Sequence, residues 1–274
     1  MPGGTVCLCL AMNRLIILLA ALVLAACSGQ APDAAPPSAA TTSAGTTTIT
    51  VLQLNICHGG MAGCYRGDAV LAKASEVIRS SRPQVLSVNE TCAADVERLR
   101  PAMGDARALF VAARNLDGTP TQCRDGDQYG NILMVADGFA GTTEETGTYD
   151  AQYRALDGHL ELRSWACLPA GEISACTTHL SSDDAPTALA QCRDLMRRAA
   201  GYPRPAVVLG DFNLKDQGSP SMAECDPPGF SRRGDGGVQH IYAGEDLSFA
   251  RTTVIDMAGT TDHPGLLASL STGH

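Results

Sequence analysis

Short apolar runs alternate along the chain with segments of helical periodicity. The stretches 48–57 (TITVLQLNIC) and 84–90 (QVLSVNE) are apolar enough for strands buried on both faces. The runs 130–136 (GNILMVA) and 205–213 (PAVVLGDFN) have the same character. We therefore predict four buried strands, three of which carry an amide or an acid at their C-terminal end.

Two segments have helical spacing instead. Between positions 68 and 81 the apolar residues recur at helical intervals, and Pro83 follows the last of them. The segment 184–200 begins with a capping acid and a proline and carries apolar residues on one side. A hairpin around PAGE is expected within 159–180, and a further strand at 238–243. This mixture predicts an α/β or α+β domain with a mixed sheet.

The N-terminal segment has a different composition. NRLIILLAALVLAAC is too short for a comfortable membrane span and ends in small residues, as export signals do. Its end, LAAC, resembles the lipobox of bacterial lipoproteins, so we expect residues 1–27 to be a signal peptide and a lipidated Cys27 to tether the protein to the outer face of the membrane. A plain secretory signal is the alternative. MNR directly before the apolar run makes Met12 a candidate start beside Met1.

Residues 28–47 are rich in Ala, Pro, Ser and Thr and have no apolar period, so they predict a flexible tether. The folded domain is then expected over residues 48–274. We expect it to be a monomer without a protein partner.

Eight cysteines remain in the expected mature domain. An even set in an exported protein predicts disulfides, and the pairs that close short loops are Cys57 with Cys64 and Cys167 with Cys176. Zinc is the alternative, but the sequence has no CxxC pair to support it. The eight are Cys57, Cys64, Cys92, Cys123, Cys167, Cys176, Cys192 and Cys225.

Charge limits the class of partner. A formal net charge of -9 argues against a protein held to nucleic acid by a large basic surface. This charge does not exclude an enzyme that binds phosphate briefly through a metal ion.

Polar side chains gather where the apolar strands end, and open sheets place their ligand sites there. In GDFN such residues also suit an ordinary turn, because short polar side chains bond their own backbone. The residues in question are Asn55, Glu90, His179, Asp211, Asn213, Asp262 and His263.

Taken in order, the motifs QLNIC, VNET, YGNILM, ELRSWAC, TTHLS, GDFN and TDHPGL resemble the endonuclease/exonuclease/phosphatase family, with GDFN and the C-terminal DH as the most specific parts. The resemblance covers about residues 48–270. It implies a four-layer sandwich, in which two mixed β-sheets pack face to face between helices. It also implies hydrolysis of a phosphoester with a divalent metal, Mg²⁺ or Mn²⁺.

The resemblance also implies a metal site. Glu90 and Asn55 match the strand-end residues that hold the ion, and Asp262 is a further candidate. Carboxylate and amide oxygens suit a hard cation such as Mg²⁺. The ion would neutralise a phosphate oxygen and steady the leaving oxygen.

The remaining matches imply catalytic roles. His263 matches the histidine that acts as general base on water. Asp211 and Asn213 would orient that water and bond the phosphoryl oxygens, and His179 would stabilise developing charge. Arg163 corresponds to a phosphate-contacting arginine.

One position departs from the family pattern. Gln239 stands where an aspartate usually orients the histidine, and an amide can orient the ring but cannot stabilise its charged form. This departure predicts reduced turnover. We expect an exported phosphodiesterase or nuclease; the alternatives are a phospholipid or small phosphate-ester hydrolase and a non-catalytic surface binding module.

Overall fold

The computed structural model describes residues 47–153 and 161–272. The expected signal peptide, Cys27 and nearly all of the expected tether lie outside the described residues, as does His159. Within the described part, no helix has the length and apolar character needed to cross a membrane.

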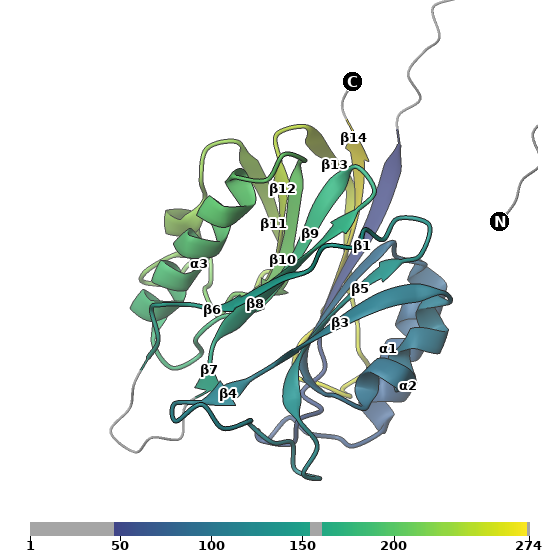
Figure 1. Ribbon diagram of the computed structural model, residues 1–274, viewed down its shortest axis with the longest axis vertical. Helices are drawn as coiled ribbons and strands as arrows, with labels where there is room; N and C mark the ends of the chain where they lie inside the picture. Colours follow the sequence, from purple (N-terminus) through teal and green to yellow (C-terminus); the bar gives the residue numbers. More distant parts are fainter. Residues whose placement is uncertain (1–46, 154–160, 273–274) are drawn as a thin grey trace, which may run out of the picture. The chain divides into compact units, whose positions relative to one another are not determined.

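Two six-stranded mixed sheets form the centre of the domain (Figure 1). In the first sheet β1 and β2 are parallel and their other neighbours are antiparallel; in the second, β9 and β10 are the parallel pair. In spatial order, the first sheet consists of β13 (Leu247–Ile255), β14 (Gly265–Thr272), β1 (Thr48–Asn55), β2 (Val85–Cys92), β5 (Tyr129–Ala136) and β3 (Ala106–Ala112). The second consists of β11 (Phe230–Gly234), β12 (Gln239–Gly244), β10 (Ala206–Asp211), β9 (Ile173–His179), β8 (Ser164–Ala170) and β6 (Glu145–Thr148). A separate pair joins β4 (Arg114–Asn115) and β7 (Glu161–Leu162).

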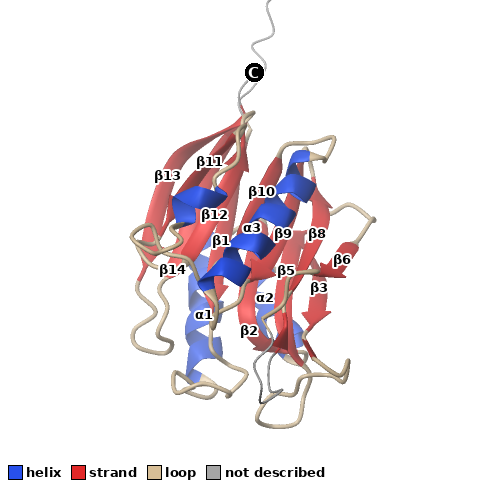
Figure 2. Ribbon diagram, turned by 90° about the vertical axis from the view of Figure 1, so that its left-hand side faces the viewer, coloured by secondary structure: helices blue, strands red, loops and turns tan. Residues whose placement is uncertain are grey.

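Helices cover the outer faces of both sheets (Figures 1 and 2). The apolar sides of α1 (Ala69–Ser81) and α2 (Asp95–Met103) pack on the first sheet. The second sheet is covered by α3 (Ala185–Ala200) together with the short 3₁₀ helix η1 (Met222–Cys225). A third apolar cluster fills the space between the two sheets. The expected four-layer sandwich is therefore confirmed.

The inward-facing residues of the central strands change character along each strand. In β1 the order is Ile49, Val51, then Gln53; in β10 it is Val207, Leu209, then Asp211. The inward residues of β2, β5, β9 and β12 turn polar at the same end of the sandwich. The space between the sheets thus has an apolar half and a polar half.

Four disulfides pair all eight cysteines of the domain. The expected bonds Cys57–Cys64 and Cys167–Cys176 are present. The others are Cys92–Cys123 and Cys192–Cys225, the second of which joins α3 to η1. Disulfide pairing, and not zinc, therefore accounts for these cysteines.

The two predicted helices, the hairpin β8–β9 and the buried strands are all present. The sequence interpretation did not include α2, which contains Pro101, or the strands β3, β11, β13 and β14. The chain therefore has more antiparallel sheet than its buried strands indicated.

Candidate active site

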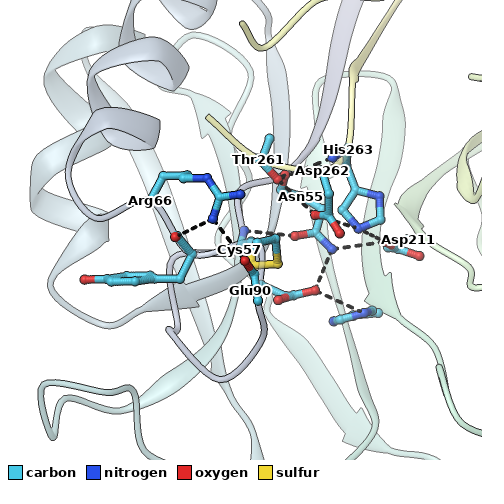
Figure 3. The surroundings of a disulfide bond; sticks show 12 residues. Asn55, Cys57, Arg66, Glu90, Asp211, Thr261, Asp262 and His263 are labelled. Carbon is cyan, nitrogen blue, oxygen red and sulfur yellow. Dashed lines mark hydrogen bonds and ion pairs between the residues drawn. A yellow bond between two sulfur atoms is a disulfide. The ribbon is translucent and has the colours of Figure 1, made fainter. Parts of the chain in front are cut away.

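The ends of β1, β2, β9 and β10 bring polar side chains together at the polar half of the sandwich (Figure 3). Asn55 occupies the centre of this cluster, because its Nδ2 donates to Glu90 Oε1 at 2.8 Å and to Asp211 Oδ2 at 3.0 Å. Asn55 Oδ1 accepts the backbone N–H of Cys57 at 3.1 Å. One amide therefore connects two carboxylates that come from different sheets.

Backbone geometry directs two of these side chains into the cluster. Glu90 has φ 58° and lies where the pairing of β2 with β5 shifts register between Val88 and Thr91. Asn213, just past β10, has φ 51°. Left-handed conformations are unusual for residues other than glycine and concentrate at functional sites. The turn in GDFN is thus both a turn and part of the site.

The two carboxylates lie in an unfavourable electrostatic environment. Burial, with a contribution from the charge of Asp211, raises the pKa of Glu90. Burial also raises the pKa of Asp211, although the nearby His263 opposes this shift. Glu90 is partly buried and Asp211 fully buried, and the two carboxylates share one amide donor. Such a pair of hard oxygen ligands suits Mg²⁺ or Mn²⁺. Glu90 and Asp211 therefore fit a divalent metal.

The orientation of Asn55 bears on its expected role. Its oxygen is held by a backbone N–H, and its amide nitrogen faces the carboxylates. In this geometry Asn55 positions Glu90 and Asp211. Asp262 is largely exposed, and its contacts within the described residues are to His263 Nε2 at 3.5 Å and to the neighbouring Thr261. Metal binding by Asn55 and Asp262 stays a prediction.

The two candidate imidazoles lie on either side of the carboxylates. His263 Nε2 is 3.6 Å from Asp211 Oδ2, and His179 Nε2 is 4.0 Å from Glu90 Oε1. Burial, reinforced by the charge of Arg163, lowers the pKa of His179 well below its usual value, so this ring is neutral at pH 7. Its Nδ1 is buried without a hydrogen-bond partner among the described residues.

Arg163 and Asn213 occupy the margin of the site. Arg163 is buried; its guanidinium lies 3.4 Å from Glu161 Oε1 and donates to Ser182 Oγ at 3.2 Å. Its charge opposes the rise in the pKa of Glu90 that burial causes. Asn213 donates its side-chain N–H to the carbonyl of Leu180 at 2.9 Å. The structure thus gathers the expected residues at one end of the sandwich.

Four buried amides behind the carboxylates complete the cluster. Gln53 donates to Asn89 Oδ1 at 2.7 Å and to Gln239 Oε1 at 2.9 Å, and Asn89 donates to Asn131 Oδ1 at 2.9 Å. The sequence interpretation did not assign a role to Gln53 or Asn89. The available signal was their spacing, since each precedes a strand-end site residue by one or two positions.

His58 and His240 lie outside the cluster. His58 Nδ1 is 2.7 Å from the buried Asp95 carboxylate, and this hydrogen bond raises the pKa of His58. His240 packs against Phe212 and bonds the carbonyl of Leu214.

Two mixed sheets between helices, with carboxylates, amides and imidazoles at one end, define the class of fold. Residues 52–263 match the model of the Endonuclease/Exonuclease/phosphatase family. The chain belongs to this family, whose members hydrolyse phosphoester bonds.

Solved structures of the family superimpose on the domain at low sequence identity. A family member from Bacteroides vulgatus has a TM-score of 0.63 at 14% identity, covering 82% of this chain and 99% of that one. D. rerio TDP2, complexed with a single-strand DNA product, gives 0.64 at 13% identity, with 82% and 100% covered. A protein from Beutenbergia cavernae gives 0.60 at 17% identity, with 82% and 72% covered. No curated protein sequence matches the chain.

Proposed function

We propose that the protein is an exported phosphodiesterase that depends on a divalent metal and cleaves its substrate by attack of water on phosphorus. The observation that carries this proposal is the pair of carboxylates, partly buried Glu90 and buried Asp211, which the amide of Asn55 brings together between two histidines. Such a site suits a cation that in turn binds phosphate.

Each residue has a task in this reaction. Glu90 and Asp211 would hold Mg²⁺ or Mn²⁺, which when bound neutralises a phosphoryl oxygen and favours departure of the leaving oxygen. His179, which is neutral and whose Nδ1 has no partner among the described residues, would hydrogen-bond a phosphoryl oxygen in the substrate complex. Arg163 adds a fixed positive charge at the margin. The proton of the attacking water has two candidate acceptors, His263 and Asp211, which are in contact.

Nucleic acid is the substrate class that we favour. The structure of the similar D. rerio protein was solved with a single-strand DNA product, and it superimposes on 82% of this chain. With a net charge of -9, the protein would engage a nucleic acid through the metal and a few local cations, so binding would be brief.

Export is supported by the cysteines. All eight in the domain form disulfides, a state that persists in oxidising compartments outside the cytosol. A lipidated Cys27 would hold the mature chain at the outer face of the membrane. Cys27→Ser should release the protein from the membrane fraction into the medium; retention in the membrane would contradict the tether.

A substrate panel tests the activity. The purified chain is incubated with Mg²⁺ or Mn²⁺ and single- and double-stranded DNA, RNA, sphingomyelin, phosphoinositides or a chromogenic phosphodiester. We expect hydrolysis of nucleic acid that EDTA abolishes and that Glu90→Gln strongly reduces. Hydrolysis of the lipids alone would instead make the protein a phospholipid hydrolase. No EDTA-sensitive hydrolysis of any substrate would leave a binding module.

A further inference from the structure

Gln239, which departs from the family pattern, belongs to a chain of hydrogen-bonded amides that runs between the two sheets. Gln53 and Asn89 belong to the first sheet and Gln239 to the second, and all three are fully buried. Their hydrogen bonds form a continuous path from the backbone to the ring of His263. The direction of each hydrogen bond along this path can be assigned.

The assignment starts at backbone groups, whose donor and acceptor roles are fixed. The backbone N–H of Asp211 donates to one side-chain atom of Asn89 at 2.9 Å, so that atom is the oxygen. The other atom of the same amide lies 3.0 Å from the carbonyl oxygen of Thr178, so it is the nitrogen. The two contacts agree, and Asn89 has one possible orientation.

Gln53 is fixed in turn by Asn89. One of its side-chain atoms lies 2.7 Å from Asn89 Oδ1 and 3.0 Å from the carbonyl oxygen of Leu54, two acceptors, and is therefore Nε2. This donor lies 2.9 Å from one side-chain atom of Gln239, which must be Oε1. Gln239 Nε2 is then the atom that faces Asp211 Oδ2 at 2.7 Å and His263 Nδ1 at 3.4 Å.

The reverse orientation of Gln239 is unfavourable on both sides. Turning its amide would set Oε1 against the carboxylate oxygen of Asp211 and Nε2 against the N–H₂ group of Gln53. Each change replaces a buried hydrogen bond with a repulsive contact of like partners. The path leaves Gln53 Oε1 buried without a partner among the described residues, so the amides are held in this orientation although one acceptor is unsatisfied.

We propose that Gln239 is a positioning residue that holds the neutral ring of His263 in the tautomer with its proton on Nε2. A neutral imidazole carries one N–H and one lone pair on nitrogen. Nδ1 faces the N–H of Gln239, so it carries the lone pair. Nε2 faces two acceptors, Asp211 Oδ2 at 3.6 Å and Asp262 Oδ1 at 3.5 Å, so it carries the proton. Both ends of the ring therefore select the same tautomer.

This tautomer changes what His263 can do in catalysis. That consequence rests on the proposed function. With its proton on Nε2, the neutral ring donates a hydrogen bond toward phosphate. It has no lone pair on that side with which to accept a proton from water. We therefore assign the neutral ring the role of a hydrogen-bond donor and not that of the base. An aspartate at position 239 would accept a hydrogen bond from Nδ1–H and favour the opposite tautomer.

Nitrogen NMR of the ring tests the proposal without any substrate. The full mature chain is labelled with ¹⁵N, without added metal, and the ring nitrogens of His263 are observed at a pH at which the ring is neutral. The resonance is assigned by its loss in His263→Ala. We expect Nδ1 at the deshielded position of an unprotonated nitrogen and Nε2 at the position of a protonated one. The reverse pattern, or an even mixture, would overturn the proposal.

Two substitutions make the test specific to residue 239. Gln239→Met, which has no donor, should add some of the opposite tautomer, because only the carboxylates at Nε2 then select. Gln239→Asp, which turns an acceptor toward Nδ1, should move the population further toward a proton on Nδ1 than Gln239→Met does. The ring of His179, which Gln239 does not contact among the described residues, serves as the internal control and should keep its pattern in every variant. If either substitution prevents folding, the wild-type spectrum still decides the tautomer. Because hydrolysis is not measured, an inactive protein could still confirm the tautomer, and an active one could still refute it.

Discussion

The two halves of the space between the sheets are built from the same strands but have opposite character. In β5 the inward residue is Leu133 in the apolar half and, two positions earlier, Asn131 in the polar half. The apolar half holds the sheets together through burial. The polar half holds a set of directed hydrogen bonds, two carboxylates with raised pKa values and one acceptor, Gln53 Oε1, that has no partner among the described residues. The residues that stabilise the sandwich and the residues of the candidate site therefore lie on the same strands, and the change from one kind to the other takes only two positions.

Replacing Asp211 by Asn should have the largest effect on activity. The carboxylate accepts hydrogen bonds from Asn55 and Gln239, and an amide in its place meets these donors with a weaker acceptor and removes a charge from the metal pair. We expect kcat/KM to fall about 10²–10⁴-fold. Steady-state kinetics on the substrate found by the panel measures this. A loss of less than about threefold would exclude Asp211 from the site.

Leu133→Ala should have the largest effect on stability. Leu133 is fully buried between the sheets, and its truncation leaves a cavity that costs about 2–5 kcal/mol. Denaturant unfolding measures the change, while kcat well below the melting temperature should stay as in the wild type. Val254→Ala, at a half-exposed position of β13, is the control and should change stability by less than about 0.5 kcal/mol. A loss of kcat in folded Leu133→Ala would show that the two halves are not independent.

Divalent metal should stabilise the polar half, and more so at higher pH. Glu90 and Asp211 have raised pKa values when folded, so the metal-free protein gains stability as pH falls through those values and loses it as pH rises. Binding of Mg²⁺ removes the repulsion and should stabilise by about 2.7 kcal/mol at a hundredfold excess over Kd. Melting curves at pH 5 and 8 measure the difference. Glu90→Gln should abolish most of the gain, whereas Leu133→Ala should retain it; an equal gain in Glu90→Gln would place the metal elsewhere.

The sequence predicted the strands of the site better than the sheets that contain them. The strands β1, β2, β9 and β10 are central and almost entirely buried, and their ends carry residues of recognisable chemistry. In contrast, β13 is largely exposed and has weak apolar alternation, so its pattern did not indicate a strand. The helix α2 contains Pro101, and a proline in the sequence argues against a helix. Packing of the buried Leu99, which the sequence does not show, stabilises this helix nevertheless.

Contacts across the sheets could not be predicted from the sequence. Gln53 and Gln239 are separated by 186 positions, and their hydrogen bond depends on how two sheets pack. The polar residues inside QLN and SVNE indicated a polar strand end, but which sheet they faced was not evident. Likewise, the left-handed conformation of Glu90 arises from a shift in pairing with β5 that its own sequence does not encode. Partners distant in the chain therefore determine the fine geometry of the site.

At the boundary between the halves, substitutions should leave activity unchanged and should affect stability mainly when one member of a hydrogen-bonded pair is removed without the other. Ser87 and Thr177 form the first polar contact between the sheets, with their hydroxyl oxygens 2.6 Å apart and both side chains buried. Ser87→Ala or Thr177→Val alone leaves one buried hydroxyl without its partner and should cost about 1–3 kcal/mol, whereas the double variant removes both and should cost less than either single one. Denaturant unfolding of the four proteins gives the coupling energy, and kcat should stay constant throughout. If the losses of stability in the two single variants add up in the double variant, each hydroxyl has another partner. A fall in kcat would show that Ser87 and Thr177 belong to the functional polar half and not to its boundary.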